Sequence, residues 1–271
     1  MTRAGSLRSR RGAGRLAALP ALGIRPSTTD VVRLLLDEAL REASDRAATE
    51  GRRTVVLDAG CGRVSALRPF RQRAGEIVGL DIDPQPSGSV EHLDRFVLAD
   101  MCTEAGAFAP ATFDVVLLSF TVEHLRDPAA ALANLATWTR TGGTLVATTV
   151  NRRHPFVAAY LVLPPKVRDR LQRVVKEHRE DAHALVGACN TRSELAAALR
   201  DAGWTDVRVF TVGHLARAWN RTWTTFAVGL AGDLITRTMP ARRSTIVAVA
   251  RRASGPRRQA GPAAAIETMS R

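Results

Sequence analysis

The sequence predicts an α/β domain built on a doubly wound sheet. Three observations favour it: short apolar runs recur along the chain, several of them end at an acid or a glycine turn, and segments of helical periodicity lie between some of them. Apolar runs without polar alternation are typical of strands that helices cover on both faces. At 271 residues and 45% hydrophobic content, the chain can form one such domain.

The apolar runs are the expected strands. The first three end at a carboxylate, Asp58, Asp81 and Asp100, and the fifth follows the glycine pair Gly142-Gly143. In chain order, strands are expected at residues 53–58, 76–81, 95–99, 113–119, 143–150, 207–210 and 245–250.

Helical patterns fill the intervals. A first helix should start at a cap on Thr28 or Thr29, since threonine favours this position, and should bury one apolar face. Asp127-Pro128 predicts a capped helix start with proline at the first position, and Gly142 the end of that helix. The buried faces are expected to hold Val32, Leu36, Leu40, Ala43 and Ala47 in the first helix, and Leu132, Leu135 and Trp138 in the second.

Two helical inserts are predicted, at about residues 152–190 and 213–241. In the first, an apolar patch at 156–165 precedes an amphipathic face that runs from Val167 to Leu185. A capping box over Thr191–Glu194 should open the next helix, which Gly203 stops. In the second, the large side chains stand at helical spacing; they are Leu215, Trp219, Trp223, Phe226, Leu230 and Leu234.

The first two strands and their loops indicate a nucleoside pocket. Gly60 and Gly62 allow backbone to approach a ligand closely, and Asp81 can accept hydrogen bonds from ribose hydroxyls. Asp58 would repel a pyrophosphate and suits a cationic ligand. The dinucleotide fingerprint would require a third glycine near Ser65, so a nicotinamide cofactor is the weaker interpretation.

These residues resemble class I S-adenosylmethionine-dependent methyltransferases, in particular type 11-like domains, whose first motif reads D-x-G-x-G. The resemblance is firm over residues 53–151 and looser over 190–252, and it implies a Rossmann-like sheet of seven strands with the last antiparallel. The inserts then follow strand five and separate strands six and seven. The matching segments are 58–62, 96–100, 113–119, 122–128 and 142–151.

The resemblance also implies cofactor-binding residues. Asp58 would face the ammonium group, Asp81 the ribose, Asp100 the adenine amino group, and Ser119 the methyl group. Asp83 competes with Asp81 for the ribose, although Asp81 directly ends the apolar run. The full expected set is Asp58, Ala59, Gly60, Cys61, Gly62, Asp81, Ile82, Asp100, Met101 and Ser119.

Two histidines are candidate catalytic bases for an acceptor that must lose a proton. His124 follows the fourth strand, where the substrate would approach, but a structural or cofactor-side role is the alternative. His154 follows the fifth strand, and its alternative role is to position the loop. The histidines and the three cysteines show no metal-ligand spacing, so no metal is expected.

The net charge of +13 comes mainly from the two ends of the chain. Residues 1–29 hold six arginines and no acid, whereas residues 250–271 hold five arginines and one acid. We therefore expect disordered basic tails at 1–27 and 253–271 around a domain at 28–252, and no strong nucleic-acid signal. A weak twin-arginine or transit-peptide pattern precedes residue 28, but a cytoplasmic location is expected.

The leading prediction is transfer of a methyl group to an O, N or C atom of a small or lipid-like molecule such as a secondary metabolite, quinone, lipid or sugar. Methylation of RNA or protein is second, and a catalytically silent binding module is third. The inserts should form a lid or core, or contact a membrane peripherally, since Arg217 and Arg221 lie beside Trp219 and Trp223.

Overall fold

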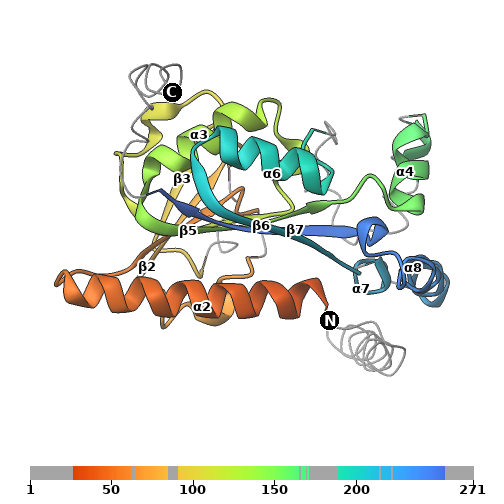
Figure 1. Ribbon diagram of the computed structural model, residues 1–271, viewed down its shortest axis with the longest axis horizontal. Coiled ribbons are helices and arrows are strands. Elements are labelled where there is room, and N and C mark those ends of the chain that lie inside the picture. Colours follow the sequence, from red (N-terminus) through yellow and green to blue (C-terminus); the bar gives the residue numbers. More distant parts are fainter. Residues whose placement is uncertain are drawn as a thin grey trace, which may run out of the picture.

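The computed structural model describes residues 27–62, 65–84, 91–164, 166–168, 170, 188–213, 215–220 and 222–253. The two expected tails, apart from Ser27 and Ala253, and most of the expected helix between Val167 and Leu185 lie outside these ranges. A central sheet separates α2 on one side from α3 and α6 on the other, and α4, α7 and α8 gather at one end of the strands (Figure 1). The described part therefore has three layers and a helical end.

The described residues form a single seven-stranded sheet of order β3-β2-β1-β4-β5-β7-β6. β7 runs antiparallel to both of its neighbours, β5 and β6, and the other pairings are parallel. The predicted fold class is thus confirmed. The strands are β1 Val55–Ala59, β2 Glu76–Asp81, β3 Arg95–Leu98, β4 Phe113–Ser119, β5 Thr139–Val150, β6 Trp204–Val212 and β7 Thr245–Arg252.

Helices connect these strands. The α-helices are α2 Thr28–Thr49, α3 Pro128–Trp138, α4 Pro155–Val162, α6 Arg192–Asp201, α7 Leu215–Ala218 and α8 Trp223–Ile235. The 3-10 turns are η1 Arg68–Phe70, η2 Ala105–Ala107, η3 Val122–His124 and η4 Pro240–Arg242. None of the helices in the described residues is both long and apolar enough to span a membrane.

The cap of the first helix lies one residue before the expected caps. Ser27 caps α2: its side chain accepts from the Asp30 backbone N–H, and the Asp30 carboxylate accepts from the Ser27 backbone in return. Thr28 is already helical and buried, so the predicted caps were wrong because the reciprocal serine–aspartate pair was overlooked. The predicted apolar face of α2 is buried throughout.

The end of α3 also differs from the prediction. Asp127 caps the helix with Pro128 at its first position, as expected, but the helix stops at Trp138 and β5 starts directly at Thr139. Gly142, at φ +72°, lies within β5 where the register against β4 shifts. The glycine pair therefore serves a bulge in the strand, not a helix end.

The helix after the first insert and the second insert are partly as predicted. Thr191 caps α6, but Glu194 pairs with Arg152 and not with the cap, so only half of the predicted capping box forms. Gly203 ends that helix at φ +88°. The second insert contains two helices, because Thr222 starts a new capped helix, α8, after the short α7.

Two apolar layers hold the sheet between its helices. Alternate residues of β4 point to opposite sides: Val115 and Leu117 pack toward α2, and Val116 and Leu118 pack toward α3 and α6. At the amino end of β4, buried Asp114 accepts two hydrogen bonds of 2.7 Å from Arg52, with further donors from Arg140 and the Val55 backbone. This network fixes β4 against β1.

Candidate functional site

The carboxyl ends of β1, β2, β3 and β4 lie at one edge of the sheet. Ala59 pairs with Leu80 in the register of β1 and β2, and Asp81 pairs with Leu98 in that of β2 and β3. The Ala99 backbone N–H then donates to the Asp81 carbonyl at 3.0 Å. The structure thereby brings the expected acids 58, 81 and 100 to neighbouring positions on this edge, where α/β sheets commonly bind ligands.

The first glycine of the loop is required by a close contact. Gly60 has φ +69°, and a Cβ at this position would lie 2.6 Å from Thr121 Oγ1. Thr121 Oγ1 in turn donates to the Ala59 carbonyl at 3.2 Å, while the N–H groups of Gly60 and Cys61 donate to the Leu80 carbonyl. Thr121, which the sequence interpretation did not single out, thus locks the loop between β1 and β4.

The second glycine of the loop, Gly62, has no close neighbour on the side where a Cβ would stand. Gly62 has φ +50°, and a Cβ at this position would have no atom within 4 Å. Its N–H donates to Asp81 Oδ2 at 2.9 Å, and the Asp83 N–H donates to Asp81 Oδ1 at 3.1 Å. Buried Asp81 is therefore held by backbone on both oxygens, each of which keeps further acceptor capacity. Ile82 and Asp83 are exposed.

Asp58 is a buried carboxylate with an incomplete set of partners. It is 1% exposed, and burial raises its pKa, while His92 and Ser65 lower it and Asp81 raises it further. Its Oδ2 atom lies 3.9 Å from His92 Nε2, and neither atom has a hydrogen-bond partner in the described part of the chain. A carboxylate in this state favours a cationic ligand nearby. The sequence interpretation missed His92, because nothing in its spacing indicates contact with β1.

The remaining expected cofactor residues follow β3 and β4. Asp100 is half-buried, and its Oδ1 accepts from the Cys102 N–H at 2.8 Å. Met101 is buried, and its carbonyl accepts from the Asn134 side chain at 2.9 Å. Ser119 ends β4 half-buried, opposite Thr148. Asp100 is therefore oriented by its own turn, and Met101 by α3.

The two candidate bases have different surroundings. His124 is half-buried at the end of η3, directly after β4. His154 is fully buried at the start of α4, where Nδ1 accepts from the Phe156 N–H at 3.1 Å and Nε2 lies 3.3 Å from the Gly232 carbonyl. Burial lowers the pKa of His154. Both of its nitrogens thus contact backbone, an arrangement that favours the loop-positioning alternative.

The arrangement fits an adenosyl ligand with a positive charge. Strand-end carboxylates provide acceptors for hydroxyl, amino and ammonium groups, and Gly62 leaves room beside them. The same acids would repel a phosphate-rich ligand. In the described residues, no group of three or more histidine, cysteine or acidic side chains could hold a metal ion.

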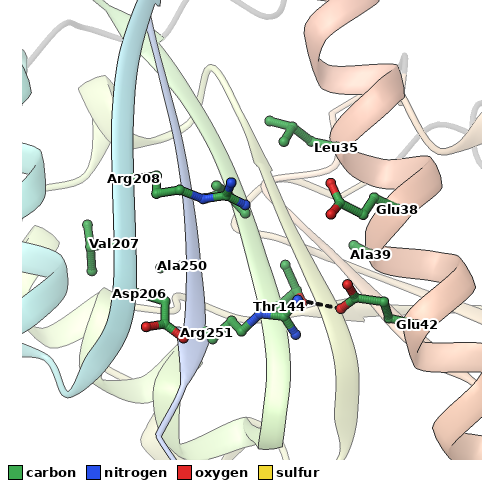
Figure 2. Close-up of a pocket in the computed structure, with 11 residues that line it drawn as sticks. Leu35, Glu38, Ala39, Glu42, Thr144, Asp206, Val207, Arg208, Ala250 and Arg251 are labelled. Atoms are coloured by element: carbon green, nitrogen blue, oxygen red, sulfur yellow. Dashed lines mark hydrogen bonds and ion pairs between the residues drawn. The ribbon is translucent and has the colours of Figure 1, made fainter.

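Two cavities lie away from this edge. One of about 480 Å³ lies between α2 and the strands β6 and β7, where Glu42 forms an ion pair with Arg251 beside Glu38 and Arg208 (Figure 2). The other, of about 580 Å³, lies between α3 and α6. Neither is lined by a residue of the expected cofactor set.

Known proteins resemble the chain in sequence. A family model described as a methyltransferase domain matches residues 32–209. Ubiquinone biosynthesis O-methyltransferase of Stutzerimonas stutzeri (strain A1501) is 30% identical over 154 residues, which cover 55% of this chain and 63% of that protein. Aklanonic acid methyltransferase DauC of Streptomyces sp. (strain C5) is 30% identical over 132 residues, or 45% and 59% of the two chains. The matches span 40% to 65% of the first ubiquinone-type relatives.

Solved structures share the fold. A SAM-dependent methyltransferase from Archaeoglobus fulgidus aligns with a TM-score of 0.51 at 17% identity, covering 87% of this chain and 98% of that chain. Geranyl diphosphate methyltransferase in complex with SAM aligns with a TM-score of 0.52 at 17% identity, covering 89% and 90%. The chain therefore belongs to the methyltransferase domain family and has the class I, Rossmann-like fold of S-adenosylmethionine-dependent methyltransferases.

Proposed function

We propose that the protein transfers the methyl group of S-adenosylmethionine to an O, N or C atom of a small or lipid-like molecule. The observation that carries this proposal is the convergence of Asp58, the Gly60–Gly62 loop, Asp81 and Asp100 at one edge of the sheet. Membership of the methyltransferase domain family supports it.

In this proposal each residue of the edge holds one part of the donor. Asp81 accepts the ribose hydroxyls, Asp58 favours the ammonium, and Asp100 accepts from the adenine amino group beside Met101. The loop from Ala59 to Gly62 passes under the ligand, next to Ile82. The donor supplies an already activated methyl group, so the chain contributes mainly positioning and exclusion of water.

Proton removal from the acceptor is assigned to His124 in preference to His154. His124 directly follows the strand that ends at Ser119, where the methyl group is expected. His154 is buried, and both of its ring nitrogens lie against backbone groups of α4 and α8. A base must reach the proton that it removes, and the surroundings of His154 disfavour this.

The acceptor is proposed to be a small or lipid-like molecule. Relatives are named for ubiquinone biosynthesis and for aklanonic acid, and a structural neighbour for geranyl diphosphate. We also propose a cytoplasmic location, where the methyl donor is made, with peripheral contact to membranes. Methylation of RNA or protein, or donor binding without catalysis, remain the alternatives.

Calorimetric titration with S-adenosylmethionine tests the donor site. Wild type should bind one donor, and Asp81→Ala should weaken binding about tenfold or more, because it removes charged acceptors of the ribose hydroxyls. Asp83→Ala is the matched control two residues away and should bind as wild type does. Absence of binding to wild type would overturn the proposal, and a loss confined to Asp83→Ala would reassign the ribose contact.

A labelled-methyl screen tests the reaction. Quinone precursors, polyketides, lipids, sugars, bulk RNA and protein would be incubated with the protein and labelled donor. Transfer to a small or lipid-like acceptor supports the proposal, and His124→Asn should slow that transfer without weakening donor binding. Transfer to RNA or protein alone, or donor binding without transfer to any of them, would favour one of the alternatives.

A further inference from the structure

The outward face of α8 carries no charged side chain. Trp223 is 66% exposed, Val228 49% and Ile235 53%, and the other exposed positions of this helix are also uncharged. The one charged residue of α8, Asp233, is buried, and its carboxylate accepts hydrogen bonds from the backbone N–H groups of Leu215 and Ala216. The exposed positions of α8 are Trp223, Thr224, Ala227, Val228, Ala231, Leu234 and Ile235.

The opposite face fixes the rotation of α8. Phe226 packs on Ala216 of α7, and a Cβ on Gly229 would lie 2.6 Å from the Leu215 carbonyl. A Cβ on Gly232 would lie 3.0 Å from Phe156 and 3.1 Å from His154. These close contacts, together with buried Asp233, prevent the helix from turning its apolar side inward. The exposed face is therefore a stable feature of the surface.

The segment of the sequence that carries this face is basic. Between residues 213 and 243 the sequence holds five arginines, and its one acid is the buried Asp233. Arg237 and Arg242 are exposed just after α8, next to exposed Met239. An apolar strip next to basic residues matches the two zones of one surface of an anionic bilayer, the acyl chains inside and the charged headgroups outside.

We propose that α8 docks the protein on anionic lipid membranes, with the apolar face in the bilayer surface and Arg237 and Arg242 against the headgroups. Trp223 would lie at headgroup level, where tryptophan is favoured. This deepens the proposed function. α8 contacts His154 and Phe156, which follow β5 at the carboxyl edge of the sheet, so docking would bring a lipid-soluble acceptor toward that edge.

Vesicle binding of the full-length protein tests the proposal. Sedimentation with phosphatidylcholine vesicles, with and without phosphatidylglycerol, should show binding that requires the anionic lipid and weakens with salt. Tryptophan emission should shift to the blue on binding, because Trp138 and Trp204 are buried and Trp223 is strongly exposed. Equal binding to both vesicle types, or to neither, would overturn the proposal.

Paired variants locate the surface. Val228→Glu with Ile235→Glu should abolish vesicle binding, whereas Leu34→Glu, at an exposed leucine of α2, should not. Arg237→Glu with Arg242→Glu should reduce binding to anionic vesicles at least tenfold, and Arg200→Glu, on α6, should not. If the α8 variants bind vesicles as wild type does, the face serves another purpose. The same holds if wild type is a dimer that does not bind vesicles and the α8 variants make that dimer dissociate.

The same proteins separate this inference from the proposed function. Donor affinity is measured by calorimetry without vesicles, and the α8 variants should bind S-adenosylmethionine as wild type does. Loss of vesicle binding with intact donor affinity would support α8 as the docking surface. Donor binding by wild type without any vesicle binding would refute the docking surface and leave the proposed methyl transfer standing.

Discussion

At the scale of single residues, the site contains a carboxylate whose burial lowers the stability of the fold. Asp58 is buried with an incomplete set of hydrogen bonds, and burial raises its pKa. A buried charge of this kind reduces the stability of the fold. The cost makes physical sense if the charge favours a cationic ligand, because the residue then serves binding at the expense of folding.

Asp58→Asn should therefore stabilise the protein and weaken donor binding. The folded state disfavours the ionised form of Asp58, and this lowers the free energy of unfolding. The loss is absent below the unfolded pKa of about 3.8 and is complete above the raised folded pKa. The gain in unfolding free energy on substitution should thus grow with rising pH. Chemical denaturation at several pH values, with calorimetry of the donor, measures both effects. A variant that is less stable at neutral pH would contradict this account.

His154 should make stability fall in mild acid. Burial lowers its folded pKa below the ordinary 6.5, so the unfolded chain takes up the proton first as the pH drops through that value. The contribution of neutral His154 to the free energy of unfolding is complete above about pH 6.5 and is lost progressively below it. His154→Asn keeps a capping acceptor, should cost about 1–2 kcal/mol at neutral pH and should remove this component of the pH dependence. Denaturation of both proteins at about pH 7.5 and 5.5 measures it.

The role of His154 in the reaction is tested with the same variant. If its function is to position α4 against α8, donor affinity and the rate with a found acceptor should change far less than stability does. Unchanged stability with abolished methyl transfer would instead make His154 the catalytic base.

At the scale of elements, patterns within one strand or helix were predictable and contacts between elements were not. The bounds of β2 and β4 follow from uninterrupted apolar runs, and the Asp127-Pro128 start of α3 follows from cap chemistry. Gly142 was misassigned because a glycine ends a helix or permits a bulge equally well. Only the pairing of Thr139 with Phe113 distinguishes the two.

The two loop glycines should respond differently to alanine. Gly60→Ala combines positive φ with overlap against Thr121 and should cost about 2 kcal/mol or more in unfolding free energy. Gly62→Ala also has positive φ but meets no neighbour, so it should cost about 1 kcal/mol and weaken donor binding by filling space. Thermal unfolding and calorimetry of each compare them. Thr121→Ala should partly rescue Gly60→Ala; no rescue would refute the contact.

The anchor at the amino end of β4 is structural. Asp114 accepts from Arg52, Arg140 and the Val55 N–H, far along the strand from Ser119. Asp114→Asn should cost about 2–3 kcal/mol, because it removes a charged partner from a nearly buried ion pair. Donor affinity at temperatures where the variant is folded should be unchanged. A large loss of affinity without loss of stability would contradict the structural assignment.

At the scale of the whole molecule, the order of the strands along the chain determines where the site forms. Parallel strands place their carboxyl ends together, so acids that end separate apolar runs were expected to meet, and residues 58, 81 and 100 do lie on one edge. The partners that come from elsewhere, Thr121 and His92, carry no such signal because their contacts depend on packing. The division of the second insert and the exposed face of α8 are likewise outcomes of tertiary structure.

The most direct test of the central claim is a crystal structure of the protein with S-adenosylhomocysteine. We predict the ribose hydroxyls on the Asp81 carboxylate, the amino-acid end alongside Gly62 toward Asp58, and the adenine next to Asp100. A ligand bound in the cavity between α2 and β6, or a ribose held by groups other than Asp81, would contradict the account.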